Sequence, residues 1–174
     1  MSRWRPPGPK TSPYVTAEGY RLLEHEVQQL WTRRADTVKH LAAAAAEGDR
    51  SENAEYIYRK KELREIDRRL GYLQRRLPVL TVVSRVPDTA DRIYFGAWVE
   101  LEDAQGVPTV YRIVGGDELD HNARYISIDA PLAQALLKRG MDDEVMVTAA
   151  NGVHRYSVLD IRYGPATGIG RDAE

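Results

Sequence analysis

Carboxylates gather in one short stretch of the chain. Its four acidic residues are Glu47, Asp49, Glu52 and Glu55, against a single basic residue. Closely spaced carboxylates can bind a hard divalent cation such as Mg²⁺, which prefers oxygen ligands and keeps several of its waters. The spacing of Asp49 and Glu52 also fits a capping box, in which Asp49 caps a helix and Glu52 reaches back from its third position. The two interpretations are compatible, because a cap also fixes the orientation of a carboxylate.

A basic run follows over residues 59–76. On a helix with about 100° per residue, its apolar positions centre on Leu70 and Leu77, and a group of cations points the other way. These cations are Lys60, Lys61, Arg64, Arg68 and Arg75. Like charges four residues apart cost a helix roughly a few tenths of a kcal/mol, so their segregation favours a phosphate-bearing partner. A plain solvated face is the alternative.

No other stretch carries an equally good constellation. The chain has no cysteine, which excludes disulfides, thiolate metal sites and cysteine nucleophiles. Its four histidines are scattered without metal-ligand spacing, and neither a nucleophile elbow nor a phosphate-binding glycine loop is present. Residues 117–121 (DELDH) could form a metal loop, but we interpret them as a solvated connection between strands. The sequence therefore predicts no self-contained enzyme.

Two helices are expected to present the acidic stretch. Thr16 suits an N-cap and Glu18 a first turn, and helical periodicity continues from Ala17 to about Ala46. A second helical pattern runs from about Glu52 to Leu77, just before Pro78. The short connection predicts an antiparallel helical hairpin, a coiled coil with the carboxylates at its tip. The expected seam residues are Tyr20, Leu23, Val27, Leu30, Val38, Leu41, Ala45, Tyr56, Leu63, Ile66, Leu70, Leu73 and Leu77.

Strand patterns replace helical ones after a linker at residues 87–88. Alternation predicts strands at 97–102, 109–113 and 124–128. Asn151-Gly152 predicts a hairpin between strands at 145–147 and 156–159. Pro131 to Lys138 is typical of one short helix that Gly140 would end. The fold class is therefore α+β, an antiparallel helical hairpin followed by a mostly antiparallel β domain with one short helix.

These patterns divide the chain into four segments. They are a disordered, Pro-rich basic arm (1–13), the hairpin (14–84), the β domain (85–163) and a flexible tail (164–174). The net charge of −1 hides an asymmetry, because residues 1–88 carry 17 Lys/Arg and 12 Asp/Glu whereas residues 89–174 carry 8 and 14. No stretch approaches the roughly 20 apolar residues of a membrane span, and the N-terminus has no apolar signal core. We expect a cytoplasmic protein with no membrane partner.

Several longer motifs resemble those of one family. Residues 48–56 (GDRSENAEY) resemble the acidic fingertip of the bacterial Gre transcript-cleavage factors. Residues 60–69 (KKELREIDRR) are similar to the second helix of the GreB type. The β half carries matching motifs at 95–100 (FGAWVE), 111–115 (YRIVG) and 125–131 (YISIDAP). The resemblance covers roughly residues 13–164, with the motifs in the right order.

This resemblance implies a transcription elongation factor that binds RNA polymerase, as a monomer. A docking domain of FKBP-like fold would grip a coiled coil at the rim of the polymerase secondary channel. The helical hairpin would enter that channel and stimulate the polymerase's own endonucleolytic cleavage of backtracked nascent RNA, rescuing arrested complexes. The factor would not be an enzyme by itself and would have no cofactor of its own.

The resemblance also implies roles for the matching residues. Asp49 and Glu52 would help to hold an Mg²⁺ ion in the polymerase active site and orient the attacking water, with Ser51 in support. Asp129 and Pro131 would lie at the polymerase-docking surface, where Ala130 replaces the serine usual in the GreB type. The nascent RNA 3′ end would be contacted by Lys60, Lys61, Arg64 and Arg68.

Two other functions compete with this one. A related secondary-channel regulator would modulate or inhibit RNA polymerase without transcript cleavage, using the same docking domain. The presence of both Asp49 and Glu52 weighs against it. A prolyl isomerase would use the globular fold alone and needs an aromatic-lined pocket. Phe95 is the only phenylalanine in the chain, although tyrosines and tryptophans are available.

Overall fold

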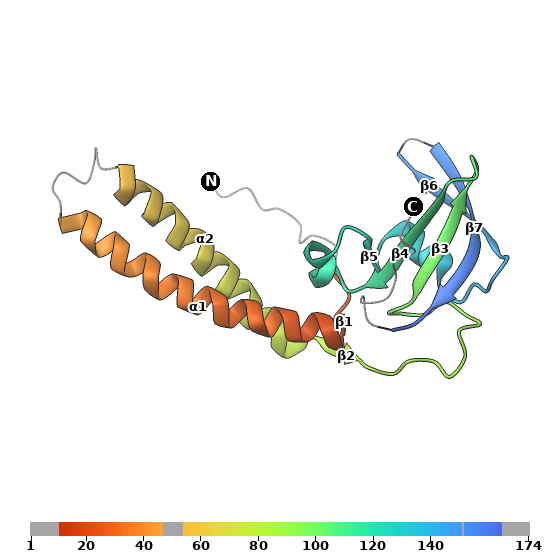
Figure 1. The fold of residues 1–174 in the computed structure, drawn as a ribbon, viewed down its shortest axis with the longest axis horizontal. Coiled ribbons are helices and arrows are strands. Elements are labelled where there is room, and N and C mark those ends of the chain that lie inside the picture. The colour runs from red at the N-terminus through yellow and green to blue at the C-terminus, as the bar shows by residue number, and fades with distance from the viewer. Residues whose placement is uncertain (1–10, 47–53, 151, 165–174) are drawn as a thin grey trace, which may run out of the picture. The chain divides into compact units, whose positions relative to one another are not determined.

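The computed structural model describes residues 11–46, 54–150 and 152–164. They divide into a globular unit, within Met1–Gly19 and Thr81–Glu174, and a helical unit, Tyr20–Leu80. Figure 1 labels α1, α2 and the strands. In chain order, the elements are β1 (Tyr14–Thr16), α1 (Ala17–Ala46), α2 (Ala54–Arg76), the 3-10 turn η1 (Leu77–Val79), β2 (Thr81–Val83), β3 (Trp98–Asp103), β4 (Pro108–Val114), the 3-10 helix η2 (Gly116–His121), β5 (Tyr125–Ser127), α3 (Pro131–Leu136), β6 (Glu144–Ala149) and β7 (Gly152–Arg162).

The helical unit is the predicted helical hairpin of α1 and α2 (Figure 1). Thr16 is the N-cap of α1, because its hydroxyl accepts the backbone N–H of Gly19 at 2.9 Å. α2 ends at Arg76, just before Pro78 at the first turn of η1. Among the described residues, no helix is long and apolar enough to cross a membrane.

The seam of the hairpin differs from the expected one at a polar layer. Leu23, Thr37 and Ala44 on α1 lie at multiples of seven residues from one another and are buried, the spacing of a coiled-coil seam. Apolar periodicity predicted the neighbouring residue Val38 in the seam, but Val38 is 40% exposed, so that prediction was wrong. On α2, the buried side chains are Glu62, Ile66, Leu70 and Leu73. Two polar side chains thus occupy positions that periodicity of apolar residues alone does not reveal.

A five-stranded sheet in the order β5-β4-β3-β7-β6 forms the core of the globular unit. Its neighbours pair antiparallel except β4 and β5, which are parallel. The five strands and the hairpin between β6 and β7 confirm the predicted β domain, and the sheet is mixed because β5 joins β4 by way of η2. Its most buried apolar side chains include Ile93, Val99, Leu101, Ile113 and Leu136.

α3 confirms the predicted short helix but ends earlier than expected. The helix stops at Leu136, and Lys138 adopts a left-handed conformation with φ 68°. Its backbone N–H donates to Ile93 O at 2.7 Å, so a tertiary hydrogen bond fixes the turn that Gly140 was expected to make.

Two short strands had no counterpart in the sequence analysis. β1 and β2 pair in parallel, with Val15 opposite Val82. Both lie in the segment 14–84 that was assigned to the hairpin, but they belong to the globular unit. Three residues are too few for a period-two alternation to be distinguished from a helix flank, which explains why the pattern did not indicate them.

The loop at residues 117–121 corrects another expectation. It was interpreted as a solvated connection, yet Glu118 is completely buried in η2. The Glu118 carboxylate accepts the backbone N–H groups of Thr16 at 3.0 Å and Gly115 at 2.8 Å, and also the Thr16 hydroxyl. A Cβ atom at Gly19 would collide with the same carboxylate. Glu118 is therefore a clamp that ties β1 and the first turn of α1 to η2, all within the globular unit.

A second clamp in the globular unit is formed by Arg112 of β4. Its guanidinium lies 5.3 Å from the ring of Trp98 and 5.5 Å from that of Tyr125. It also donates to Glu18 in the first turn of α1 at 2.9 Å and to the backbone oxygen of Gly164 at 3.2 Å. Burial opposes the charge of Arg112, but the hydrogen bonds with Glu18 and Tyr125 leave its pKa raised. Gly164, assigned to the tail, is thus held by Arg112.

Candidate functional site

The acidic tip is defined by the helices that flank it. α1 ends at Ala46 and α2 begins at Ala54. The predicted metal and catalytic residues, Asp49, Ser51 and Glu52, lie outside the described residues. Within the ranges that the structure does describe, no group of three or more histidine or acidic side chains could hold a metal ion.

The four predicted RNA contacts lie together on α2, directly after the tip. Lys60, Lys61, Arg64 and Arg68 are on the surface of the helix, whereas Ile66 and Leu70 are buried in the seam. We call these four residues the basic face. In the described part of the chain, no side chain forms an ion pair or hydrogen bond with any of the four. Lys60 does lie 5.7 Å from the Tyr56 ring.

Several arginines outside the basic face are, by contrast, paired with carboxylates. Among the described residues, ion pairs that join α1 to α2 include Arg33–Glu62 at 2.6 Å, Arg34–Asp67 at 2.7 Å and Arg69–Glu26 at 2.7 Å. Within α2, Arg59 pairs with Glu55 at 2.7 Å. The hairpin thus neutralises cations near its seam, whereas those of the basic face have no carboxylate partner among the described residues.

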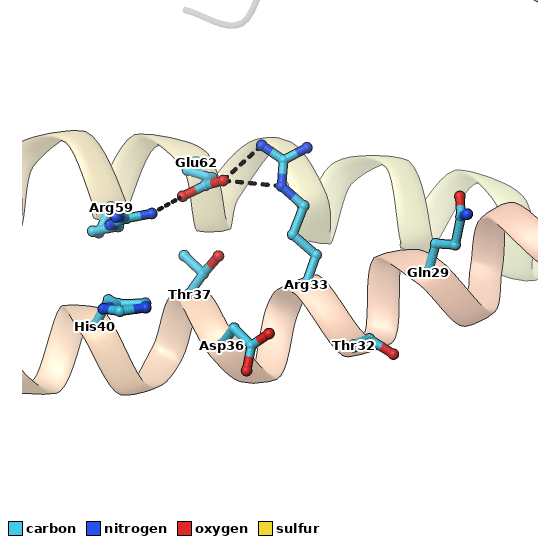
Figure 2. Close-up of a pocket in the computed structure, with 8 residues that line it drawn as sticks. All are labelled: Gln29, Thr32, Arg33, Asp36, Thr37, His40, Arg59 and Glu62. Atoms are coloured by element: carbon cyan, nitrogen blue, oxygen red, sulfur yellow. Dashed lines mark hydrogen bonds and ion pairs between the residues drawn. The ribbon is translucent and has the colours of Figure 1, made fainter.

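A polar groove of about 420 Å³ opens between α1 and α2 (Figure 2). Glu62 lies in it between Arg59 of its own helix and Arg33, which reaches across from α1. Arg33 donates to Glu62 Oε1 at 2.9 Å from Nε and 2.6 Å from Nη2, and Arg59 donates to Oε2 at 3.0 Å. The Arg33 hydrogen bonds lower the pKa of Glu62 against the opposing effect of burial, and the one from Arg59 adds to the shift.

The two predicted docking residues follow β5. Asp129 is exposed, and its carboxylate accepts the backbone N–H of Ser12 at 2.9 Å as well as the Ser12 hydroxyl. Pro131 opens α3, and Ala130 is the N-cap without a side-chain hydrogen bond. A serine at this position could cap the helix, whereas alanine cannot. Ser12 belongs to the segment that was assigned to a disordered arm, of which residues 1–10 lie outside the described residues.

The comparisons with known proteins agree over both units. The N-terminal model of the GreA/GreB transcription elongation factors matches residues 13–82, and their C-terminal model matches residues 88–163. Transcription elongation factor GreB of Xanthomonas axonopodis pv. citri is 54% identical over 165 residues, which cover 94% of this chain and 98% of that protein. The chain belongs to the GreB family of transcription elongation factors. GreB of Pseudomonas aeruginosa is 50% identical over 167 residues, 95% of this chain and 99% of that protein.

The GreB family membership confirms the resemblance found in the fingertip and second-helix motifs. Among solved structures, Gfh1 of Thermus aquaticus is 25% identical, with a TM-score of 0.41 over 89% of this chain and 100% of that chain. The matched N-terminal region contains the acidic tip and the basic face, and the matched C-terminal region contains Asp129 and Pro131.

Two residues of this GreB-family chain were not identified from its sequence. Ser12 has no signal, because a serine in a Pro-rich stretch predicts no long-range partner. Glu62 did have a sequence signal. Its position on α2 is next to the apolar seam, where a carboxylate needs a partner.

Acidification should weaken the hairpin through Glu62. Because the pKa of Glu62 is lowered on folding, its contribution is complete above the ordinary glutamate value of 4.5 and is lost as the pH falls through the lowered value. Thermal unfolding followed by circular dichroism between pH 6 and 3 should show a falling midpoint. Glu62→Gln should reduce this pH dependence. An equal dependence in the variant would show that other carboxylates account for it.

Proposed function

We propose that this GreB-family protein binds RNA polymerase and stimulates the polymerase's own endonucleolytic cleavage of backtracked nascent RNA in the cytoplasm. The globular unit would dock at the rim of the secondary channel through the surface that includes Asp129 and Pro131. The hairpin would enter the channel as part of a monomer. The protein would act without enzymatic activity or a cofactor of its own, and arrested complexes would be rescued by the new RNA 3′ end.

The observation that carries this proposal is the basic face, which follows immediately after the acidic tip in the sequence. The cations of the basic face have no carboxylate partner among the described residues. An RNA strand extruded into a channel presents phosphates, which such exposed cations attract. Carboxylates at the end of a helical hairpin can be delivered to a metal ion in another protein, where oxygen ligands suit Mg²⁺. Such an ion would supply polarisation of the scissile phosphate and activation of water. Asp49 and Glu52 would help to hold it and orient the attacking water, with support from Ser51.

A transcript-cleavage assay tests the proposal. Purified RNA polymerase is stalled on a template with 5′-labelled RNA, allowed to backtrack, and mixed with this protein and Mg²⁺. The labelled RNA should shorten from its 3′ end and then be extended when nucleotides are added. Binding to the polymerase without shortening would instead identify a secondary-channel regulator that acts without cleavage.

Charge reversal of the basic face should change the products of this reaction. With Lys60, Lys61, Arg64 and Arg68 replaced by glutamate, contact with the extruded RNA weakens, so long fragments should disappear and short ones dominate. The measurement is the length distribution of the released 3′-labelled RNA. The single reversal Arg64→Glu should show part of this effect. Lys39→Glu, a reversal of an exposed cation on α1, should show none.

Unchanged fragment lengths in the fourfold variant would remove the basic face from RNA binding. Salt gives an independent check, because the affinity for RNA falls as salt rises, and this fall should become less steep with every phosphate-binding cation that is removed.

A further inference from the structure

The helical hairpin has a polar layer in its seam where apolar packing would be more stabilising. Glu62 is one of the buried residues of α2, and Thr37 of α1 is 2% exposed. Replacing a buried ionic cluster by apolar side chains is often neutral or stabilising. The best-attested advantage of a polar group in a coiled-coil seam is the choice of one register over others.

Two of the ion pairs between the helices share one alignment. Arg33 meets Glu62 and Arg69 meets Glu26, and the residue numbers of both pairs add up to 95, as required when two antiparallel helices are aligned, whereas those of Arg34 and Asp67 add up to 101. Leucine seams tolerate a slip of seven residues, because the apolar pattern repeats at that interval. Such a slip moves one helix along the other by roughly 10 Å, at about 1.5 Å per residue.

Either slip would bring like charges together. In one direction, Arg33 meets Arg69, although Glu26 meets Arg76. In the other direction, Glu26 meets Glu62 and Arg34 meets Lys60, although Arg33 meets Glu55. The observed register is the one in which Arg33, Glu26 and Arg34 all find a carboxylate or guanidinium of opposite charge. Each slip thus gains one attraction but adds at least one repulsion, so the charges favour the observed alignment over both alternatives.

We propose that Glu62, held by Arg33 and Arg59, is a positioning residue that fixes the axial register of the hairpin and thereby the place of the acidic tip. This inference rests on the proposed function, since the place of the tip matters only if the tip acts at the polymerase. Asp49 and Glu52 lie in the connection between the helices, so a slip of one helix changes how much chain is left to form the tip. A misplacement far smaller than the roughly 10 Å of a slip is enough to cost a large part of a reaction rate.

The test starts from Glu62→Arg. This change abolishes the attraction to Arg33 and creates an attraction to Glu26 in the slipped register, so it should populate that register. The charge swap Arg33→Glu with Glu62→Arg should restore the original one. Glu62→Gln is the milder variant, in case the first reduces helicity. Asp36→Asn is the matched control, because Asp36 lines the same groove but pairs with Lys39 on its own helix at 3.8 Å.

Register is measured directly in the full-length protein. Because the chain has no cysteine, spin labels at Gln28→Cys and Gln74→Cys report a single distance by pulsed electron resonance. We expect one narrow distribution for the parent and Asp36→Asn, a broadened or shifted one for Glu62→Arg, and a narrow one again for the charge swap. An unchanged distribution in Glu62→Arg would overturn the register role.

Function is measured in the cleavage assay as two separate quantities. The maximal cleavage rate should fall about tenfold or more in Glu62→Arg and recover in the charge swap, whereas the protein concentration for half-maximal cleavage, which reports docking, should stay within about twofold. A shifted distance with a normal maximal rate would contradict the positioning role. If the parent protein itself cleaves nothing, the proposed function fails together with the positioning role, and the distances alone still decide the register.

Discussion

Asp49→Asn should reduce the maximal rate of transcript cleavage by roughly 100-fold, the order expected when a group that holds or orients a metal ligand is lost. Asparagine still caps a helix well, so the substitution removes the charge and keeps the local structure. The effect should therefore appear in cleavage and not in the helicity of the hairpin. Glu52→Gln should act in the same direction, as the partner in placing metal or water.

The controls separate a role in cleavage from a role in docking. Asp49→Asn should still compete with the parent protein for RNA polymerase at equal concentration, because the substitution leaves the proposed docking surface around Asp129 unchanged. Asp36→Asn, an exposed carboxylate on α1, should cleave like the parent. If Asp49→Asn retains full cleavage activity, Asp49 is only the helix cap that its spacing from Glu52 also allows.

The elements that the sequence predicted well are those with long periodic patterns. The first helix was predicted from Ala17 to about Ala46 and has those bounds, and it begins at Ala17 because Thr16 provides a side-chain cap. β1 and β2 were missed because each has three residues and is stabilised by a partner about 67 residues away in the chain, which is information that no local pattern contains. The same holds for Lys138, whose conformation depends on Ile93.

The candidate site likewise has residues that a local pattern predicts and residues whose role depends on a distant partner. The cations of the basic face were found because they share one side of a helix, and spacing alone determines that. The ion pairs of the neighbouring arginines were not predictable. A pair such as Arg33–Glu62 depends on how far α1 is shifted along α2, which the sequence of either helix alone does not determine. Glu118 was misread for a related reason. An acidic residue among other acidic residues suggests solvent, and only the tertiary structure brings it to the backbone of Thr16.

Glu118→Gln should destabilise the globular unit by about 3 kcal/mol, a large part of the stability of an ordinary domain. The buried carboxylate accepts three hydrogen bonds. Both backbone N–H groups point at Oε2, so a glutamine can keep them only by placing its amide nitrogen against the Thr16 hydroxyl, which then loses its charged acceptor and already accepts the Gly19 N–H. Urea unfolding followed by the fluorescence of Trp98, with Trp4 and Trp31 replaced by phenylalanine, measures this unit. Asp120→Asn, an exposed change in the same 3-10 helix, should have little effect.

Gly19→Ala should destabilise the same unit, because the added methyl group would occupy the space of the Glu118 carboxylate. The two substitutions damage one contact, so their effects should not add. The double variant should lose at least about 1 kcal/mol less than the two single losses together, within the usual range for residues in contact. Simple additivity would show that Gly19 and Glu118 act independently. In that case the loss in Glu118→Gln would come from its hydrogen bonds with Thr16 and Gly115, and not from its packing against Gly19.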